Sequence, residues 1–333
     1  MAYNCTPIWR WTTCTVNVEN RQRSAGWWLV LCILSSSVLS AQLDSTFVET
    51  FGERSRINGG IRYRDNSAVF SVNDREELTL TNRGLALRIG GRYRWIGYTF
   101  SIPISDLGTG SELGDAKSLG ANIQFYRNTF YLNANVRRTI GFERDSPDRA
   151  PEFREDIRFL NALLFGFRIL NSKRFSLRSS FRLRNRQLRS AGSWLVGGAV
   201  ARQVIKADSL ELPLREAGTS VIDRFSQTKI GTGVGYAYTF IFGKYWFATP
   251  LLIAGPEIRF IAFDPLGTER EVERLRLSAR VRGRISVGAN GIRNYIALSA
   301  SYLPSADNSD AFDTRVDEVQ IELRIGHRIG VKD

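Results

Sequence analysis

A regular alternation of apolar and polar side chains is the feature of this sequence that most restricts its fold. In the stretch LRLSARVRGRISV, Leu275 to Val287, the odd positions are aliphatic or small, and the even positions carry serine or arginine. Successive side chains of an extended strand point to opposite faces, so this period predicts a strand with an apolar medium on one side and a polar medium on the other. No helical period of any length follows the N-terminal region.

The same alternation recurs along the chain and predicts a series of strands. The predicted strands are 56–72, 84–93, 96–104, 119–126, 129–138, 156–169, 174–186, 192–205, 227–241, 245–254, 272–287, 292–303 and 314–329. Long polar loops are predicted at 105–118, 139–155, 206–226, 255–271 and 304–313, and tight turns at 93–96, 126–129, 170–174, 242–245 and 288–292. Short turns at one end and long loops at the other are typical of bacterial outer-membrane barrels.

An outer-membrane barrel with both termini on the periplasmic side needs an even number of strands. The short link between Arg186 and Ser193 stands where a long loop is expected, so we interpret Phe175–Val204 as one interrupted strand. The sequence therefore predicts an all-β fold, a transmembrane antiparallel β-barrel of about twelve strands. Fourteen strands are the alternative, with one strand missed.

The N-terminal region has the features of an export signal. Arg21 and Arg23 precede an apolar run from Trp27 to Leu39, and small residues at Ser40 and Ala41 follow as a cleavage site. The run is shorter than the roughly 20 residues of a spanning helix. We predict an N-terminal extension and cleaved signal peptide at 1–41, a short periplasmic lead-in at 42–55, the barrel at 56–333, and location in the bacterial outer membrane.

The residues that most enzymes and metal sites use are scarce. Cys5, Cys14 and Cys32 all lie in the segment predicted to be removed, which excludes a disulfide framework and a thiolate site from the mature chain. His327 is the single histidine and lies close to the end of a predicted strand. We predict no catalytic residues, no metal and no cofactor; a barrel enzyme built around His327 is the alternative.

Two sets of arginines are the candidate functional residues. In a barrel whose apolar residues face lipid, both sets point into the lumen; they are Arg174, Arg178, Arg182, Arg184, Arg276, Arg280, Arg282 and Arg284. Guanidinium groups bind carboxylate and phosphate, so such a lumen would select small anionic solutes. The alternative is that Glu318, Glu322 and other acids pair with the arginines and fill the lumen. The formal charge of +13 also suits nucleic acid, but the export signal argues against that partner.

Aromatic residues surround the short turns. Those we assign to an interfacial girdle are Tyr93, Trp95, Tyr98, Phe242, Tyr245 and Trp246. Aromatic rings gather where hydrocarbon meets headgroups, whereas in a soluble sheet the same rings would form cross-strand pairs. The girdle predicts outer-membrane lipid and lipopolysaccharide as partners, and an outer-membrane barrel implies the barrel insertion machinery as a further partner.

Four stretches resemble an uncharacterised family of outer-membrane β-barrels from Bacteroidetes, a domain of unknown function of the DUF4421 type. They are NRGLALRIGGRYRWIGYTFSIPI (82–104), RQLRSAGSWLVGGAV (186–200), GVGYAYTFIFGKYWFA (233–248) and RIGHRIG (324–330). The resemblance implies a barrel from about residue 50 onward and no known activity. The closing residues of family members are similar to GYRF, whereas this chain has Gly326, His327, Arg328 and Ile329 at the corresponding place.

These features predict a non-enzymatic outer-membrane protein, either a narrow basic channel for small anionic solutes or a structural barrel. The alternatives are a barrel enzyme acting on outer-membrane lipid or lipopolysaccharide, and a soluble secreted β-sandwich.

Overall fold

The computed structural model describes residues 43–51, 55–72, 75–93, 96–104, 117–146, 149–214, 218–265, 271–272, 275–308 and 313–329. They belong to one compact unit, Ala41–Asp333. The predicted signal peptide and Trp95 lie outside the described residues. Within the described residues, no helix is long and apolar enough to cross a membrane.

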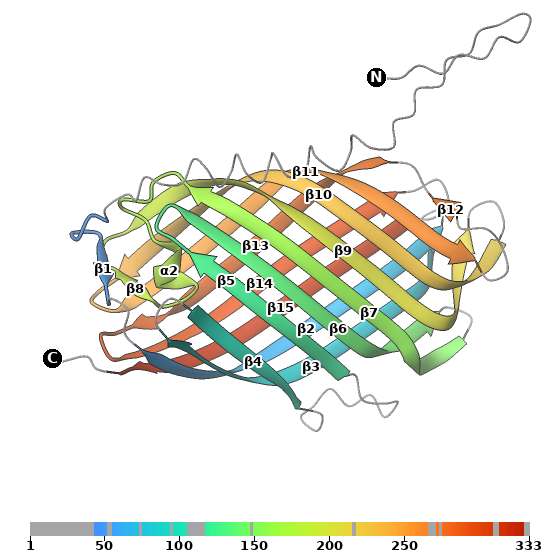
Figure 1. Cartoon of the computed structure of the whole chain (residues 1–333), viewed down its shortest axis with the longest axis horizontal. Coiled ribbons are helices and arrows are strands. Elements are labelled where there is room, and N and C mark those ends of the chain that lie inside the picture. Colours follow the sequence, from blue (N-terminus) through green and yellow to red (C-terminus); the bar gives the residue numbers. More distant parts are fainter. Residues whose placement is uncertain are drawn as a thin grey trace, which may run out of the picture. The chain divides into compact units, whose positions relative to one another are not determined.

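Twelve long strands dominate the described chain (Figure 1). In chain order they are β2 (Arg56–Val72), β3 (Arg75–Tyr93), β4 (Ile96–Ile104), β5 (Lys117–Tyr126), β6 (Phe130–Ser146), β7 (Arg149–Ile169), β9 (Ala191–Leu214), β10 (Gly218–Phe242), β11 (Trp246–Pro265), β13 (Arg276–Asn290), β14 (Asn294–Asn308) and β15 (Asp313–Arg328). Smaller elements are β1 (Val48–Thr50), α2 (Leu177–Ser180), β8 (Asn185–Gln187) and β12 (Glu271–Val272).

Ten of the strands form a closed ring by antiparallel pairing. The order is β3-β2-β15-β14-β13-β11-β10-β9-β7-β6, and β3 pairs with β6 to close it. The first and last strands of the ring in sequence, β2 and β15, pair without a register shift from Arg56 opposite Arg328 to Ser71 opposite Asp313. A single closed sheet confirms the predicted barrel and excludes the two packed sheets of a sandwich.

The closure between β3 and β6 has an unusual form, which we call the seam. The two strands pair directly only from Thr79–Thr81 to Glu143–Asp145. Farther along, β4 pairs with β3 and β5 pairs with β6, so these two strands occupy the rest of the seam. No ladder pairing joins β4 to β5 in the part of the chain that the structure describes. The wall therefore has ten strands at one end and twelve at the other, in agreement with a prediction of about twelve.

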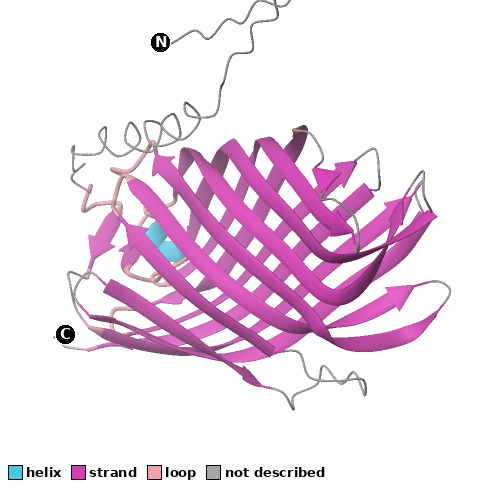
Figure 2. Cartoon of the chain, turned by 45° about the vertical axis from the view of Figure 1, so that its right-hand side comes forward, coloured by secondary structure: helices cyan, strands magenta, loops and turns pink. Residues whose placement is uncertain are grey.

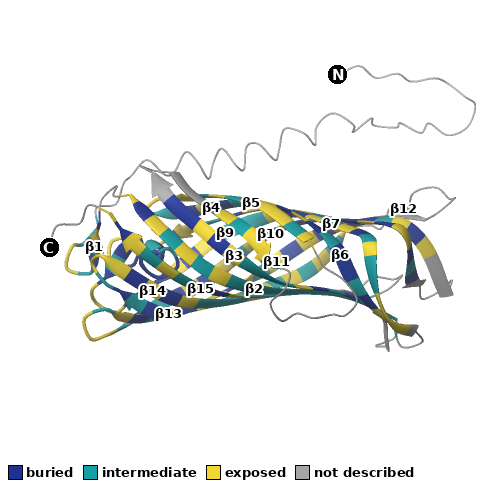
Figure 3. Cartoon of the chain, turned by 90° about the horizontal axis from the view of Figure 1, so that it is seen from below, coloured by how far each residue is buried: buried dark blue, intermediate teal, exposed yellow. Residues whose placement is uncertain are grey.

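The two faces of the wall differ in chemistry, as the alternating colours along the strands show (Figure 3). On β13, Leu277, Val281 and Ile285 are exposed on the outer face, and the arginines between them face the lumen. Exposed aliphatic and aromatic side chains cover the outer face of the other long strands in the same way. An apolar exterior around a charged interior is the distribution expected of a barrel surrounded by lipid.

Several predicted loops were wrong, because strands continue through them. β6 and β7 extend into the stretch 139–155, β9 and β10 into 206–226, and β11 into 255–271. These stretches are rich in charged and polar residues, which suggested loops, but their inward-facing residues, such as Leu210, Leu212 and Ile222, are apolar and buried. The backbone ladder depends only on main-chain groups and continues through them. We call this end of the barrel the long-hairpin end, and the opposite end, with the tight turns, the short-turn end.

The predicted strand at 174–186 was also wrong. Residues 171–190, which we call the plug, leave the wall between β7 and β9 and fold inside the lumen at the short-turn end (Figure 2). The plug contains the one-turn helix α2, a left-handed residue at Leu183 with φ 54°, and β8, which pairs with β1. Phe175, which the alternation placed on lipid, is fully buried in the core there.

The plug also explains why β7 faces opposite to expectation. Its apolar residues Phe165 and Ile169 point inward and pack on Phe175 and Phe181 of the plug. The outer face of β7 instead carries residues such as Leu160, exposed by 43%. An apolar face shows that a strand faces surroundings without water, and for β7 these surroundings are the plugged lumen.

A glycine allows one close approach inside the wall. Gly326 of β15 lies opposite Tyr295 of β14, and a Cβ at position 326 would overlap the tyrosine ring. We expect Gly326→Val to lower the free energy of unfolding by about 1–3 kcal/mol, since the buried ring has no room to move. Denaturant unfolding in lipid vesicles measures this. Gly84→Ala, where a Cβ meets nothing within 4 Å, is the control; equal losses in the two variants would contradict the explanation.

Candidate functional site in the barrel lumen

The plug is attached to the wall by arginines that donate to its backbone. Arg324 donates to the carbonyl of Phe181 at 3.1 Å, and Arg328 donates to the carbonyl of Leu183 at 2.6 Å. Arg56, on the neighbouring strand β2, donates to the carbonyl of Arg182. Three successive plug carbonyls are thus satisfied by three guanidinium groups, which lets the segment lie in the lumen without strand partners.

Hydroxyl and amide side chains hold the plug from the other side of the lumen. Ser180 is linked to Thr239 at 3.1 Å and accepts from Thr249 at 2.7 Å, and all three residues are buried. Ser286 donates to the carbonyl of Ser180, and Asn290 donates to the carbonyls of Ser179 and Asn185, so β13 contributes to the same attachment. Buried polar groups that are hydrogen-bonded specify one position of a segment, so these bonds fix the plug at the short-turn end.

Charged side chains occupy the middle of the lumen and centre on three glutamates. Glu322 binds Arg62 at 3.3 Å and also contacts Arg88 and Arg324. Glu318 and Glu257 each contact two further arginines. These pairs are Glu318 with Arg64 at 3.7 Å and Arg137 at 3.3 Å, and Glu257 with Arg259 at 3.0 Å and Arg280 at 3.6 Å.

Arginine donors exceed the acidic acceptors in this layer. Among these contacts of the described residues, seven arginines meet three glutamates, an excess of four positive charges within this group. The Nε atoms of Arg62, Arg64, Arg88 and Arg137 are buried and have no hydrogen-bond partner among the described residues. A buried donor without an acceptor is unfavourable, so the layer has chemical capacity for additional acceptors such as an anion.

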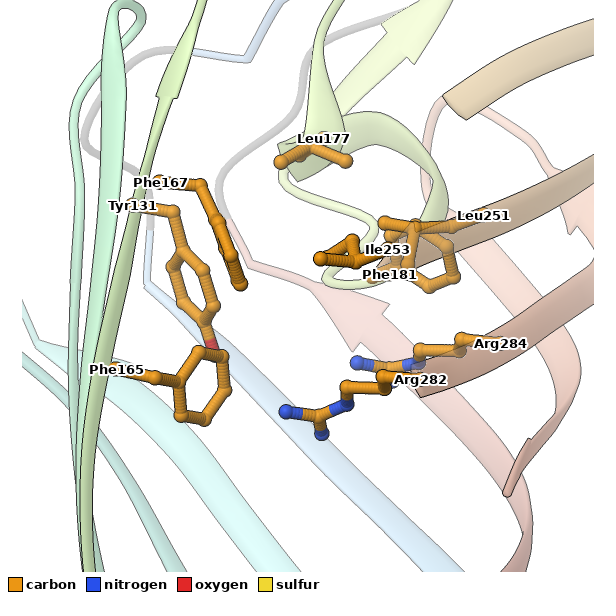
Figure 4. A pocket seen from close by; sticks show the side chains of 9 residues that line it. All are labelled: Tyr131, Phe165, Phe167, Leu177, Phe181, Leu251, Ile253, Arg282 and Arg284. Carbon is orange, nitrogen blue, oxygen red and sulfur yellow. The ribbon is translucent and has the colours of Figure 1, made fainter. Parts of the chain in front are cut away.

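A pocket lies between this charged layer and the plug (Figure 4). Its lining residues are Tyr131, Phe165, Phe167, Leu177, Phe181, Leu251, Ile253, Arg282 and Arg284. The aromatic side chains of β6 and β7 lie on one side and the residues of β11 and β13 on the other, and plug residues complete it. Two guanidinium groups therefore meet an otherwise apolar space.

The long-hairpin end of the lumen is apolar. Phe70, Leu80, Phe142, Ile157 and Phe225 belong to one buried cluster there. A second pocket lies against this cluster and includes Gln203 and Gln227 in its lining. Along its axis the lumen thus consists of an apolar layer, a charged layer and the plug.

The structure separates the two sets of predicted arginines. Arg276, Arg280, Arg282 and Arg284 lie on the inner face of β13. Arg280 pairs with Glu257, whereas the guanidinium carbons of Arg282 and Arg284 lie 4.5 Å and 4.4 Å from the ring centres of Phe165 and Phe181. The other four belong to the plug: Arg174 is exposed against Phe47, and Arg178, Arg182 and Arg184 lie at least partly buried within it.

The predicted acidic partners, Glu318 and Glu322, form ion pairs with five arginines outside the two predicted sets. These partners were not predicted from the sequence; they are Arg62, Arg64, Arg88, Arg137 and Arg324. Arg62 and Arg64 alternate with Ile61 and Tyr63, so a shorter version of the arginine alternation was present in the sequence.

Aromatic side chains are exposed on the outer wall at the short-turn end. Phe242 and Trp246 of the predicted girdle are 55% and 59% exposed, and Tyr245 lies between Lys244 and Arg186. The outer face of β10 carries a row of neighbouring rings, Tyr236, Tyr238, Phe240 and Phe242. The backbone at Tyr93 and Tyr98 belongs to β3 and β4, and their side chains lie outside the described part.

His327 points away from the lumen. It is exposed on β15, and its Nδ1 lies 2.7 Å from the amide oxygen of Asn294. Within the described ranges, no three His, Cys, Asp or Glu side chains form a group that could hold a metal ion.

A closed antiparallel wall, an apolar exterior and an arginine-rich lumen with an internal plug define a plugged transmembrane β-barrel. The chain belongs to the family described as domain of unknown function DUF4421, whose model matches residues 42–328. This confirms the family that the sequence resembles.

Several solved barrels are similar to the chain. The outer membrane protease OmpT from Escherichia coli has 6% identity and a TM-score of 0.42, over 84% of this chain and 98% of that one. The beta domain of the Bordetella autotransporter BrkA has 15% identity and a TM-score of 0.39, over 82% and 100%. The COG4313 outer membrane channel from Pseudomonas putida F1 has 13% identity and a TM-score of 0.33, over 84% and 97%. No curated protein matches the sequence.

Proposed function

We propose that the protein is a non-enzymatic barrel of a bacterial outer membrane that conducts small anionic solutes, with the plug as its gate. The observation that carries this proposal is the excess of arginine donors over glutamate acceptors in the middle of the lumen. A solute crossing the barrel must pass this layer, and buried guanidinium groups favour carboxylate and phosphate over cations.

The plug supports a gated channel over an open one. Its carbonyls bind wall residues through Arg324, Arg328 and Asn290, and its apolar side chains pack on the inner face of β7. These contacts are side-chain hydrogen bonds and apolar packing and are separate from the strand ladder, so displacement of the segment would leave the ladder paired. A structural barrel without conductance is the competing outcome.

Ion selectivity tests the proposal. The purified protein in a planar bilayer, held in a KCl gradient, is expected to show a reversal potential of the sign given by chloride preference. Arg280→Glu combined with Arg282→Glu should weaken or reverse this preference, because the lumen then carries carboxylates where it had guanidinium groups.

The matched control makes the same change in net charge outside the lumen. Arg83 and Arg315 are 56% and 62% exposed and belong to surface ion pairs, so Arg83→Glu with Arg315→Glu should leave the reversal potential unchanged. Cation preference in the unaltered protein, or no ion current from it, would contradict an anion channel.

A further inference from the structure

The pocket beneath the plug has a mostly apolar lining and contains one buried hydrogen-bond donor without an acceptor among the described residues. The side chain of Arg282 enters it from β13 (Figure 4), and its Nη1 is buried with no hydrogen-bond partner in the described part of the chain. The neighbouring Arg280, on the same face of β13, is paired with Glu257. Of these two arginines, only Arg282 has a buried donor without an acceptor among the described residues. Arg282 interacts with Glu318 only through longer-range electrostatics.

The ring of Phe165 holds the Arg282 guanidinium in place. The guanidinium carbon lies 4.5 Å from the ring centre, and Tyr131 packs edge-on against the same ring at 5.4 Å. A guanidinium stacked on an aromatic face keeps its in-plane N–H groups available to a carboxylate. The donor is therefore oriented before any ligand arrives.

The rest of the pocket suits a compact apolar body. Phe167, Leu251 and Ile253 line it together with Leu177 and Phe181 of the plug. An inorganic anion would leave most of this surface without a contact, whereas an uncharged hydrocarbon would leave Arg282 without an acceptor.

We infer that this pocket binds a small amphipathic carboxylate. Its carboxylate accepts from Arg282, with Arg284 adding positive charge beside it, and its aromatic or branched apolar body lies among Phe165, Phe167 and Ile253. This inference names the solute class of the proposed channel and so rests on that proposed function. Since Leu177 and Phe181 belong to the plug, the bound solute touches the gate itself.

Calorimetric titration of the barrel in lipid nanodiscs tests the inference with three probes. 4-Phenylbutyrate should bind at a single site, and 4-phenylbutyramide and butyrate should each bind at least about tenfold more weakly, since one lacks the charge and the other the apolar body. Empty nanodiscs give the correction for partition into lipid.

Two variants remove different halves of the site. Arg282→Gln should weaken 4-phenylbutyrate binding by at least about tenfold, with Arg282→Lys intermediate because an ammonium keeps charge without the planar fork. Phe167→Trp should abolish binding by filling the space and leaves every charge in place. Arg158→Gln, on the exposed outer face of β7, is the control and should bind as the unaltered protein does. Heat-modifiable gel mobility shows that each variant is folded.

The amide binding as tightly as the carboxylate, or binding that survives both Arg282→Gln and Phe167→Trp, would overturn the inference. Chloride selectivity measured on the same preparations separates the two proposals. Selective current without 4-phenylbutyrate binding refutes the pocket and leaves the channel, whereas binding without current supports the pocket and refutes the channel.

Discussion

Glu322→Gln is expected to destabilise the barrel by about 3–5 kcal/mol. Glu322 is 4% exposed and contacts Arg62, Arg88 and Arg324, so its carboxylate neutralises three buried guanidinium groups at once. Glutamine keeps the size and one acceptor oxygen but removes the charge, which leaves the three cations facing one another in a region of low dielectric constant. Arg324 also holds the plug, so the plug should loosen as well.

Equilibrium unfolding in lipid vesicles, followed by circular dichroism, measures this loss. Asp317→Asn on the same strand is the matched control, because Asp317 pairs with the 62% exposed Arg315 and should change stability by less than about 1 kcal/mol. Similar losses in the two variants would show that the charged layer is not what stabilises the lumen.

Removing the plug should raise the single-channel conductance severalfold. Ile169 of β7 already pairs with Leu195 of β9, and Asn171 donates to the side chain of Ser193, so a short Gly-Ser linker can replace residues 173–188 without stretching the wall. The deletion removes the short-turn closure but retains the charged layer, so chloride preference should persist. It also removes the buried core around Phe175 and Phe181, and the variant should unfold at lower denaturant concentration.

A point variant distinguishes gating from simple obstruction. Asn290→Ala removes the hydrogen bonds to the carbonyls of Ser179 and Asn185 and leaves the plug present. A movable gate then opens more often at the unaltered conductance level. If the deletion variant conducts no more than the unaltered protein, the plug is not the barrier to ion flow.

The alternation in the sequence predicted the wall of the barrel well. It placed strands at the twelve positions where long strands occur and predicted an apolar outer face for β13, because the side-chain period of a strand follows directly from backbone geometry. Strand ends were predicted less well, since the hairpins at the long-hairpin end contain many charged residues and so resemble loops, although their inner face is apolar.

The plug could not be predicted from the same pattern. Phe175, Leu177, Phe181 and Leu183 alternate with polar residues as in a strand, yet they pack inside the lumen. Alternation shows that a segment has an apolar side but not whether lipid or protein covers it. The wall residues that make this possible, such as Arg324, Arg328 and Asn290, lie more than 100 positions away in sequence.

The candidate site was predicted only in outline. An arginine-rich lumen followed from the ladder on β13, but the partners of Glu318 and Glu322 depend on which strands face each other across the ring. Arg282 and Arg280 look alike in the sequence, and only the registers of β11 and β13 place Glu257 within reach of one of them.

The strand pairing at the seam differs from every other strand pairing in the described ring. Continuous pairing of β2 with β15 ties the two ends of the ring together, whereas β3 and β6 share only a short ladder and β4 and β5 lie beside it. Under lateral tension from the surrounding bilayer, separation would begin where the fewest backbone hydrogen bonds must break. The barrel is therefore expected to open first between β3 and β6, in the N-terminal half of its chain, while the pairing of β2 with β15 stays intact.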